Sequence, residues 1–400
     1  MKAASVNDYR ELARRRLPRF LFEYIDGGAY DEVTLARNVD DLRQIRLRQR
    51  VLRDVSGIEL ATTLFGQKIS LPLALAPIGL AGLNARRGEV QAVQAAGAAG
   101  IPFCLSTVSA CAIAEVQAGA QQPFWFQLYM IRDRPFMRDL LAQARHARCS
   151  ALVFTVDMPV PAARYRDYRS GLAGAPGFKG STRRALQALS RPAWAYHVGL
   201  RGRPHSLGNI APVLGRQSGI EDFFAWMRRN FDPTVTWKDL EWVRTQWPGP
   251  LIIKGILDAE DAREACALGA DGIIVSNHGG RQLDGVRSSA HALPAIVELV
   301  GNRTTVLVDG GIRSGLDVVR MLALGAKAVL IGRPWVYALA ARGRVGVEHV
   351  LALFEAEMRT AMALAGLTSV TSIDTQALDL DCSQRDLGRA RFRPWSLLPC

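Results

Sequence analysis

The chain has 400 residues, of which 49% are hydrophobic and 22% are charged, so it can bury a large core and is too apolar for a disordered protein. The formal net charge of +13 at pH 7 indicates an anionic partner, which composition leaves open between nucleic acid, an acidic membrane surface and small anions. No signal-peptide core opens the chain and no apolar run is long enough to cross a bilayer, so a cytoplasmic protein with at most peripheral membrane contact is expected.

The six cysteines have neither CxxC spacing nor zinc-site spacing to a His. Free thiols in a reducing compartment, and no metal site, are therefore expected.

The N-terminal segment, residues 1–60, is expected to form short helices, with Ser5 or Asn7 as the first N-cap. It contains Tyr24, which stands just before an Asp-Gly-Gly turn at 26–28. On residue type alone, such a Tyr is most often a half-buried aromatic side chain.

From residue 71 onward, short apolar runs alternate with Ala-rich helical stretches. The runs lie at 71–76, 101–105, 124–128, 151–156, 251–253, 272–275, 305–308 and 328–331. Eight strands that alternate with helices predict an α/β fold, a (β/α)8 TIM barrel, rather than a doubly wound sheet. We expect one domain over 1–380 with the barrel at 61–375, followed by a basic, disordered tail at 381–400.

One connection, between the fourth and fifth runs, breaks this alternation. Residues 164–220 carry ten Arg or Lys and a single acid, Asp167. A loop of this length is usually functional or mobile. The basic residues, together with Trp194 and Tyr196, favour a membrane-contacting insertion at about 169–220; a solvated basic loop without a partner is the alternative. Nucleic acid is disfavoured because no recognised binding motif occurs.

Polar side chains follow the predicted strands at the point where each strand ends. In a closed barrel these ends share one face, where barrel enzymes build their active sites. The residues in question are Ser106, Tyr129, Asp157, Lys254, His278, Asp309 and Arg333.

The stretch VSNHGGRQLD, at 275–284, follows a buried strand. His278 offers a general base whose charge changes near neutral pH. Arg281 offers a planar fork that suits a carboxylate. A surface loop with an incidental His and Arg is the alternative.

Two further loops indicate a phosphate site. The stretch DGGIRSG, at 309–315, precedes a helix, and Gly332-Arg333 follows the last strand. Loops after strands seven and eight are the usual phosphate site of barrel enzymes. No GxGxxG motif follows the first strand, which favours a phosphate-bearing flavin over NAD. Lys254 fits a Schiff-base lysine, a phosphate ligand or a charge beside a flavin ring, and its position alone does not separate these.

Together these motifs resemble those of the FMN-dependent 2-hydroxy-acid dehydrogenases and oxidases, over about 9–375. The similarity includes YIDGGA at 24–29, FQLY at 126–129, TVD at 155–157 with Arg164, IKG at 253–255 and VDGGIR at 308–313. Within that family, GILD at 255–258 and RPAWA at 191–195 resemble the bacterial membrane-associated L-lactate dehydrogenases.

The resemblance implies that FMN oxidises L-lactate to pyruvate and that electrons pass to the respiratory chain through a quinone. It also implies a peripheral position on the cytoplasmic side of the inner membrane and a homo-oligomer, tetrameric by analogy. Within the enzymes, the alternatives are an (S)-mandelate-type dehydrogenase and an O2-using 2-hydroxy-acid oxidase. A non-enzymatic basic binding protein that reuses a barrel is the alternative from another class.

The resemblance assigns roles by position. His278 is the expected base and Asp157 its orienting carboxylate, while Tyr129 hydrogen-bonds the substrate hydroxyl. Tyr24, Arg164 and Arg281 hold the substrate carboxylate, and Lys254 lies near the flavin N1–C2=O edge. The other expected FMN contacts are Pro77, Gly79, Ser106, Gln127, Thr155, Ser276, Asp309, Gly310, Gly311, Arg313, Gly332 and Arg333.

Two positions depart from the plant-type oxidase pattern. Val108 stands where a Trp lines that pocket, and Gly79 stands where an Ala often approaches the flavin N5. Both departures disfavour an O2-using oxidase and leave the size of the substrate open.

Overall fold

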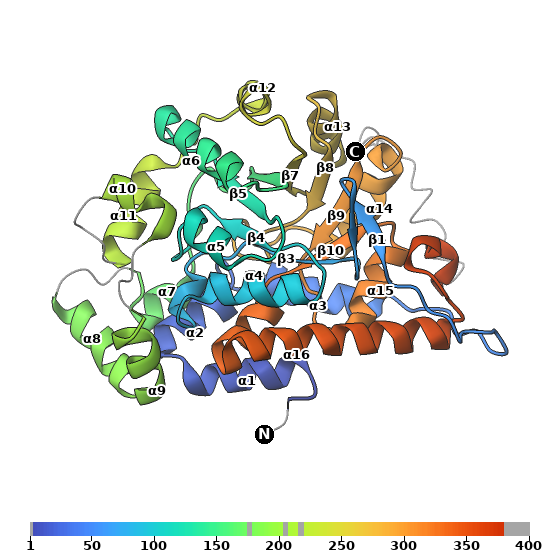
Figure 1. Ribbon diagram of the computed structural model, residues 1–400, viewed down its shortest axis with the longest axis horizontal. Coiled ribbons are helices and arrows are strands. Elements are labelled where there is room, and N and C mark those ends of the chain that lie inside the picture. The colour runs from blue at the N-terminus through green and yellow to red at the C-terminus, as the bar shows by residue number, and fades with distance from the viewer. Residues whose placement is uncertain (1–2, 174–177, 203–206, 215–219, 380–400) are drawn as a thin grey trace, which may run out of the picture.

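A ring of eight parallel strands forms the centre of the computed structural model, which describes residues 3–173, 178–202, 207–214 and 220–379 (Figure 1). The strands are β3 (Leu73–Leu75), β4 (Cys104–Ser106), β5 (Trp125–Tyr129), β6 (Ala151–Thr155), β7 (Leu251–Ile256), β8 (Gly272–Val275), β9 (Thr305–Asp309) and β10 (Ala328–Ile331). β3 pairs with β10, and a parallel bridge between Leu75 and Phe103 closes the ring toward β4. The predicted (β/α)8 barrel is confirmed.

The strands are buried on both faces, which explains why they appear in the sequence as continuous apolar runs. Their inward side chains, among them Val153, Ile274 and Leu330, form one cluster inside the barrel. A hairpin of β1 (Thr62–Leu64) and β2 (Gln67–Ile69) adds Leu64 and Ile69 to that cluster. The sequence did not reveal this hairpin.

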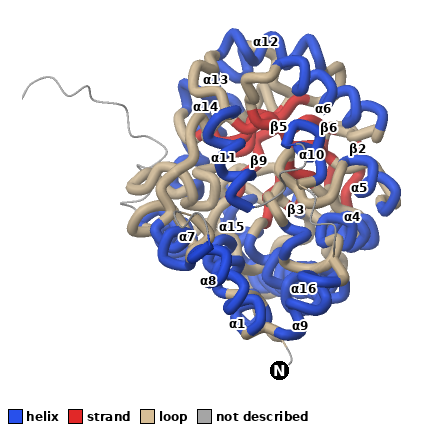
Figure 2. The backbone as a smooth tube through the Cα atoms, turned by 90° about the vertical axis from the view of Figure 1, so that its left-hand side faces the viewer, coloured by secondary structure: helices blue, strands red, loops and turns tan. Residues whose placement is uncertain are grey.

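Helices surround the strands, as Figure 2 shows. Around the barrel lie α4 (Gly88–Ala98), α5 (Ile113–Gly119), α6 (Arg134–His146), α12 (Trp237–Gln246), α13 (Ala259–Ala267), α14 (Ser289–Val300), α15 (Gly315–Ala323) and α16 (Arg333–Ala365). Short 3-10 turns lie at Ala81–Leu83, Gly208–Ile210, Val370–Ser372 and Thr375–Ala377.

The N-terminal segment packs against this ring. It forms α1 (Val6–Arg16), α2 (Arg19–Asp26) and α3 (Val33–Gln44). Residues 45–61, also expected to be helical, are extended instead, and bridges from Leu47 to Leu378 and from Glu59 to Ser369 hold them.

The basic connection between β6 and β7 is largely helical in its described parts. It contains α7 (Tyr165–Ser170), α8 (Phe178–Leu189), α9 (Pro192–Trp194), a π-helical turn (Ala195–Leu200), α10 (Ala211–Leu214) and α11 (Ile220–Asn230). Figure 1 places α8 and α9 in a lobe beside α2 and α1.

The expectation that Trp194 faces a membrane is wrong. Only 8% of Trp194 is exposed. Its ring packs nearly perpendicular to that of Phe20, with ring centroids 6.3 Å apart, and its Nε1 donates to the Leu83 carbonyl at 2.8 Å. The indole therefore has both its apolar surface and its donor satisfied inside the protein. Tyr196, two residues on, is 46% exposed.

The connection is also part of the barrel's support. Val198, Leu207 and Ile210 belong to the main core. Asn209 is buried, donates from Nδ2 to the Ser109 hydroxyl at 3.1 Å and accepts the Ile113 N–H at 2.8 Å. Replacing the whole segment with a flexible linker would remove these contacts, so the segment is not a detachable loop.

The disorder predicted for the tail at 381–400 falls outside the described residues. Within the described residues, no helix combines the length and the apolar character needed to cross a bilayer. Cys104, Cys111, Cys149 and Cys266 are free thiols.

Candidate active site

A single cavity opens at the C-terminal ends of the barrel strands. Most of the side chains predicted for the site line it: Tyr24, Pro77, Gly79, Tyr129, Thr155, Arg164, Lys254, His278, Arg281, Asp309, Gly310, Gly311, Arg313, Gly332 and Arg333. Four predicted residues, Ser106, Gln127, Asp157 and Ser276, do not line it. Asp157 and Ser276 nevertheless contact lining residues, since Asp157 pairs with His278 and Ser276 accepts a hydrogen bond from Lys254.

His278 lies in a tight turn after β8. Its φ is 57°, a left-handed value that is unusual for a residue with a side chain, and Ser276 Oγ accepts its backbone N–H at 3.0 Å. Its Nδ1 lies 2.9 Å from Asp157 Oδ1. Because Nδ1 is engaged by the carboxylate, Nε2 is the ring nitrogen left for proton transfer.

A bulge in β7 makes room for that carboxylate. The β7–β8 register shifts between Lys254 and Ile256, and Gly255 between them has a φ of 108°. A Cβ on Gly255 would lie 2.6 Å from the Asp157 side chain. Gly255 therefore allows Asp157 to reach His278.

The electrostatics of the pair favour a neutral imidazole beside an ionised carboxylate. Burial lowers the pKa of His278 below its ordinary value, although Asp157 opposes the shift. Burial also disfavours ionisation of Asp157, but attraction to His278 and Lys254 outweighs it, so the pKa of Asp157 lies below its ordinary value. A neutral imidazole can accept a proton, and the carboxylate then stabilises the resulting cation.

Lys254 is buried and charged. Burial disfavours its ammonium form, but attraction to Asp309 and Asp157 outweighs this and raises the pKa of Lys254. Its Nζ lies 3.0 Å from Asp309 Oδ2 and donates to Ser276 Oγ at 2.8 Å. A Schiff-base lysine must be neutral, so these contacts favour a fixed positive charge over a nucleophile.

Arg281 is held by backbone carbonyls. Its Nη1 donates to Tyr24 O at 2.5 Å and Gly27 O at 2.8 Å, and its guanidinium lies 4.9 Å from the Tyr24 ring centroid. Arg164 lies 6.0 Å from the centroid of the same ring. Burial, followed by repulsion from Arg164, lowers the pKa of Arg281 to about 10. Two guanidinium groups beside one aromatic ring have the charge and the geometry to bind a carboxylate.

Backbone carbonyls hold Arg333 in the same way, and Gly27 O accepts from both arginines. Arg333 donates to Ile25 O, Gly27 O and Gly279 O, each at 2.9 Å. Burial lowers the pKa of Arg333 to about 9 and also lowers the pKa of Arg313.

The two predicted phosphate loops both line the cavity. The helices that follow them differ in whether their N-terminal backbone N–H groups can bind an anion. The first N–H of α15, on Gly315, donates to Glu357 Oε2 at 2.6 Å, so a carboxylate already occupies that helix end. The N-cap of α16 is Gly332, which has no side-chain cap and lines the cavity. The start of α16 is therefore the helix end that could receive an anion.

Sequence reasoning missed an apolar wall. Phe223, Phe224 and Met227 from α11 line the cavity, as does Met158. The paired phenylalanines indicate a helix with an apolar face, but nothing local reveals which surface that face covers.

Gly79 and Val108 also line the cavity and lie against each other. A Cβ on Gly79 would lie 2.8 Å from Val108 Cγ2 and 3.4 Å from Tyr24 Oη. A larger residue at position 79 would therefore require Val108 to move.

Comparison with known proteins decides the family. The family model described as FMN-dependent dehydrogenase matches residues 13–380. The chain belongs to the FMN-dependent dehydrogenase family. It is 64% identical to an L-lactate dehydrogenase of Caulobacter sp. (strain K31), over 94% of this chain and 99% of the relative. An L-lactate dehydrogenase of Azorhizobium caulinodans is 60% identical, over 94% and 99%.

Among solved structures of this family, one is described as the monotopic membrane protein (S)-mandelate dehydrogenase. It superimposes with a TM-score of 0.89 at 38% identity and covers 95% of this chain and 100% of that one.

The cavity fits the flavin that this family uses. Thr155 Oγ1 and Asp309 Oδ1 belong to residues that line the cavity, and both are buried atoms without a hydrogen-bond partner in the described part of the protein. Buried polar atoms are normally paired, so these two favour a polar ligand in the cavity. They come from β6 and β9, while the basic and glycine-rich loops after β9 and β10 suit a phosphate. The residues present therefore fit FMN.

We predict that Asp157→Asn lowers the pKa of His278 further. The substitution removes the attraction that opposes the shift, while burial and repulsion from Lys254 and Arg164 remain. The His278 transition, followed by NMR of histidine-labelled protein, should move to lower pH. The exposed carboxylate Asp258 supplies the control, since Asp258→Asn should leave the transition in place. A transition in Asp157→Asn that stays fixed or moves to higher pH would contradict the pairing.

Proposed function

We propose that the protein is an FMN-dependent L-lactate dehydrogenase, and that its electrons pass to a membrane quinone. The observation that carries the proposal is that His278, with Asp157 behind it, lines one cavity together with Arg281 and Arg164. A 2-hydroxy acid needs both elements, a base for the proton and a receptor for the carboxylate. L-lactate is favoured because relatives at 64% and 60% identity are L-lactate dehydrogenases.

In this proposal the basic side chains bind the substrate first. The Nη1 of Arg281 donates to two backbone carbonyls, and these hydrogen bonds orient the remaining N–H groups of the guanidinium. Together with Arg164 and the Tyr24 hydroxyl, they take the carboxylate. Tyr129, buried against Phe231 with ring centroids 5.0 Å apart, donates to the substrate hydroxyl. Burial raises the pKa of Tyr129, so it remains a phenol donor.

Proton transfer then falls to His278. Its neutral Nε2 accepts a proton as lactate is oxidised, and Asp157 stabilises the imidazolium that forms. FMN, when bound, would take up the two electrons and the second proton that leave the substrate. Lys254, charged and fixed by Asp309, supplies a positive field where electron density collects.

The residues proposed to hold FMN are those predicted from the sequence. Pro77, Gly79, Ser106, Gln127, Thr155, Lys254 and Ser276 would lie around the ring, and Asp309, Gly310, Gly311, Arg313, Gly332 and Arg333 would hold the ribityl chain and its phosphate. The homo-oligomeric state, tetrameric by analogy, stays a prediction from the family resemblance.

Anaerobic mixing of the purified yellow protein with L-lactate tests this function. We expect L-lactate to bleach the flavin faster than (S)-mandelate or D-lactate does. His278→Gln should retain FMN and lose rate by about 10²–10⁴, the usual effect of removing a general base. Faster reduction by (S)-mandelate would favour a mandelate-type enzyme. Near-normal reduction in His278→Gln would remove His278 from the base role.

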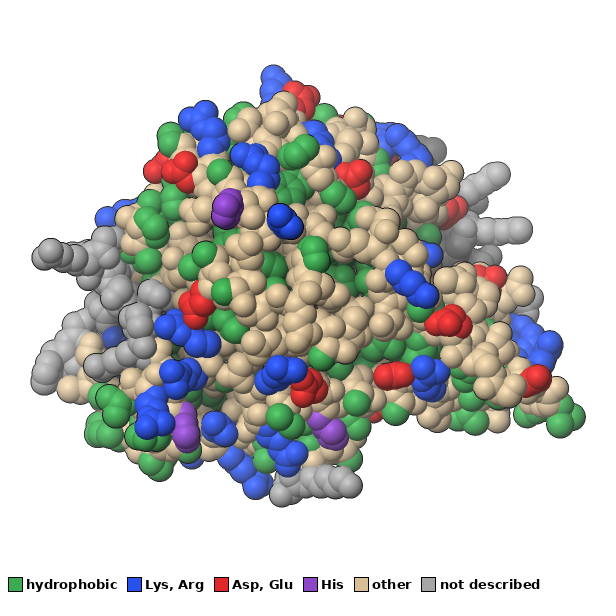
Figure 3. All heavy atoms as spheres, viewed as in Figure 1, with side chains coloured by type: hydrophobic (Ala, Val, Ile, Leu, Met, Phe, Trp, Pro, Cys, Tyr) green, Lys and Arg blue, Asp and Glu red, His purple; other side chains and the backbone are tan. Residues whose placement is uncertain are grey.

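The same proposal places the enzyme on the cytoplasmic face of an anionic inner membrane. In the helical insertion, Leu186 and Leu189 on α8 are 68% and 71% exposed, and Arg183 is exposed beside them. Exposed Arg201 lies over the Tyr196 ring at 5.1 Å. Figure 3 shows hydrophobic and basic side chains together on this lower-left lobe. Such a surface suits anionic lipid.

The double variant Leu186→Ser/Leu189→Ser tests this surface. It should reduce co-sedimentation with anionic phospholipid vesicles and slow electron transfer to a membrane quinone, while flavin reduction by L-lactate persists. Leu52 and Leu364, 102% and 60% exposed and outside the insertion, provide a matched control as Leu52→Ser/Leu364→Ser. Equal vesicle binding by the two double variants would exclude α8 as the contact.

A further inference from the structure

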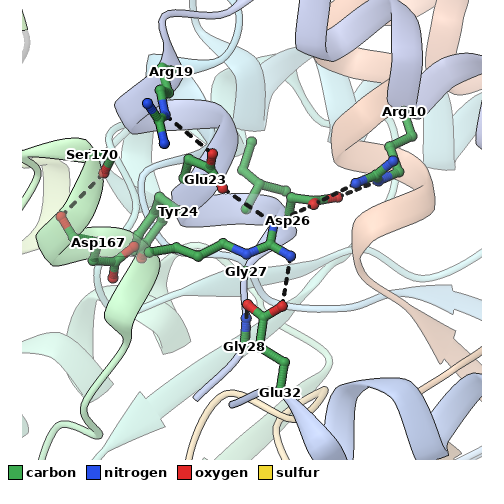
Figure 4. Close-up of polar contacts among 12 residues, drawn as sticks. Arg10, Arg19, Glu23, Tyr24, Asp26, Gly27, Gly28, Glu32, Asp167 and Ser170 are labelled. Carbon is green, nitrogen blue, oxygen red and sulfur yellow. Dashed lines mark hydrogen bonds and ion pairs between the residues drawn. The ribbon is translucent and has the colours of Figure 1, made fainter. Parts of the chain in front are cut away.

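A buried carboxylate at the end of α2 joins four helices. Asp26 is only 5% exposed. Its carboxylate accepts Arg10 Nε at 2.6 Å and Nη2 at 2.8 Å, Arg166 Nη1 at 2.8 Å and Tyr337 Oη at 2.6 Å. Figure 4 shows Arg10 and Asp26 pointing toward each other. These partners lie on α1, α7 and α16, far apart in the sequence.

Arg166 carries a second branch of the same cluster. Its Nη2 donates to Glu32 Oε2 at 2.6 Å, and its Nη1 also reaches Glu23 Oε2 at 3.2 Å. The other oxygen of Glu32 accepts the backbone N–H of Gly28 at 2.8 Å. Arg166 therefore fixes both sides of the 24–28 turn, through Asp26 and through Glu32.

Backbone carbonyls of the 24–28 turn hold two of the arginines that line the cavity. The carbonyls of Tyr24 and Gly27 accept Arg281, and those of Ile25 and Gly27 accept Arg333. Just beyond the turn, the Ala29 N–H donates to Gly280 O at 2.8 Å, which joins the turn to the loop that carries His278. Carbonyl dipoles also offset the cost of burying these guanidinium groups.

Residues 24–26 of this turn are the last residues of α2, and Ile25 is buried in the core, whereas Gly27 and Gly28 have no side chain to pack. The Asp26 cluster holds the chain on both sides of this glycine pair, through Asp26 and through Glu32. Burial disfavours ionisation of Asp26, yet hydrogen bonds from Arg10, Tyr337 and Arg166 outweigh it and lower the pKa to about 2. The cluster thus keeps its charge at any physiological pH.

We infer that Asp26 and Arg166 are positioning residues that set the reach of Arg281 toward the substrate carboxylate, acting through the carbonyls of the 24–28 turn. The inference rests on the proposed role of Arg281. Neither residue touches the cavity, so neither is a catalytic residue. The competing interpretation is that the cluster only fastens the N-terminal helices to the barrel.

The test uses FMN-loaded protein and oxalate, a planar carboxylate that the enzyme does not oxidise. Oxalate affinity is read from the flavin absorption spectrum, and the KM and kcat for L-lactate are measured beside it. In Asp26→Asn and Arg166→Gln we expect the oxalate Kd and the KM to rise by about tenfold, with a smaller fall in kcat, because the carboxylate receptor is displaced. Arg166→Lys keeps the charge and one hydrogen bond, so it should recover part of the loss.

A second Asp–Arg ion pair, which is more exposed and lies at the opposite end of the barrel, supplies the control. Asp271, directly before β8, accepts Arg244 Nη1 at 2.9 Å, so Asp271→Asn should leave the oxalate Kd and the KM unchanged. If Asp26→Asn does not fold, Arg166→Gln decides, because Arg166 is partly exposed. Wild-type oxalate Kd and KM in Arg166→Gln, with only a lower melting temperature, would overturn the inference. Should the parent not oxidise L-lactate, the proposed function fails, while oxalate binding still reports on the receptor.

Discussion

The cavity holds more buried positive charge than its own acids neutralise, and much of the structure serves to hold that charge in place. Lys254, Arg164, Arg281, Arg313 and Arg333 line it, whereas Asp309 is the only acid among the described residues that line it, with Asp157 directly behind His278. Burial and mutual repulsion lower the pKa of Arg281 to about 10 and that of Arg333 to about 9. An excess of this kind is stable when backbone carbonyls solvate it and when anions occupy the site. A flavin phosphate and a substrate carboxylate are two such anions.

The fold meets this requirement with two layers. Parallel closure of the barrel brings the strand ends to one rim, and that rim supplies the charged side chains. The N-terminal helices then supply the carbonyls, since the 24–28 turn receives both Arg281 and Arg333. The helical insertion contacts the same rim through Asn209 and the loop after β4. The segment that carries the proposed lipid-binding surface is thus joined by direct contacts to the rim of the barrel.

The strands and the candidate site were largely predictable because their signals are local. Each strand is a continuous apolar run, and apart from Arg164 each proposed functional residue stands next to a strand end or a glycine-rich turn. Other features depend on contacts between distant segments, which local patterns do not encode. Trp194 is of a residue type common at membrane interfaces, but it is buried against Phe20. Likewise, nothing in the sequence around Phe223 and Phe224 indicates that they line the cavity. The three partners of Asp26, which are Arg10, Arg166 and Tyr337, were not predictable either, because a single acid beside a glycine pair is typical of many turns.

The central claim is that this buried charge receives the substrate carboxylate within reach of His278. A crystal structure of the FMN-loaded protein with pyruvate bound tests it most directly. The account predicts the pyruvate carboxylate between Arg281 and Arg164, with its keto oxygen near Tyr129 and His278 Nε2. A carboxylate bound elsewhere, with Arg281 still engaged only by the carbonyls of Tyr24 and Gly27, would contradict it.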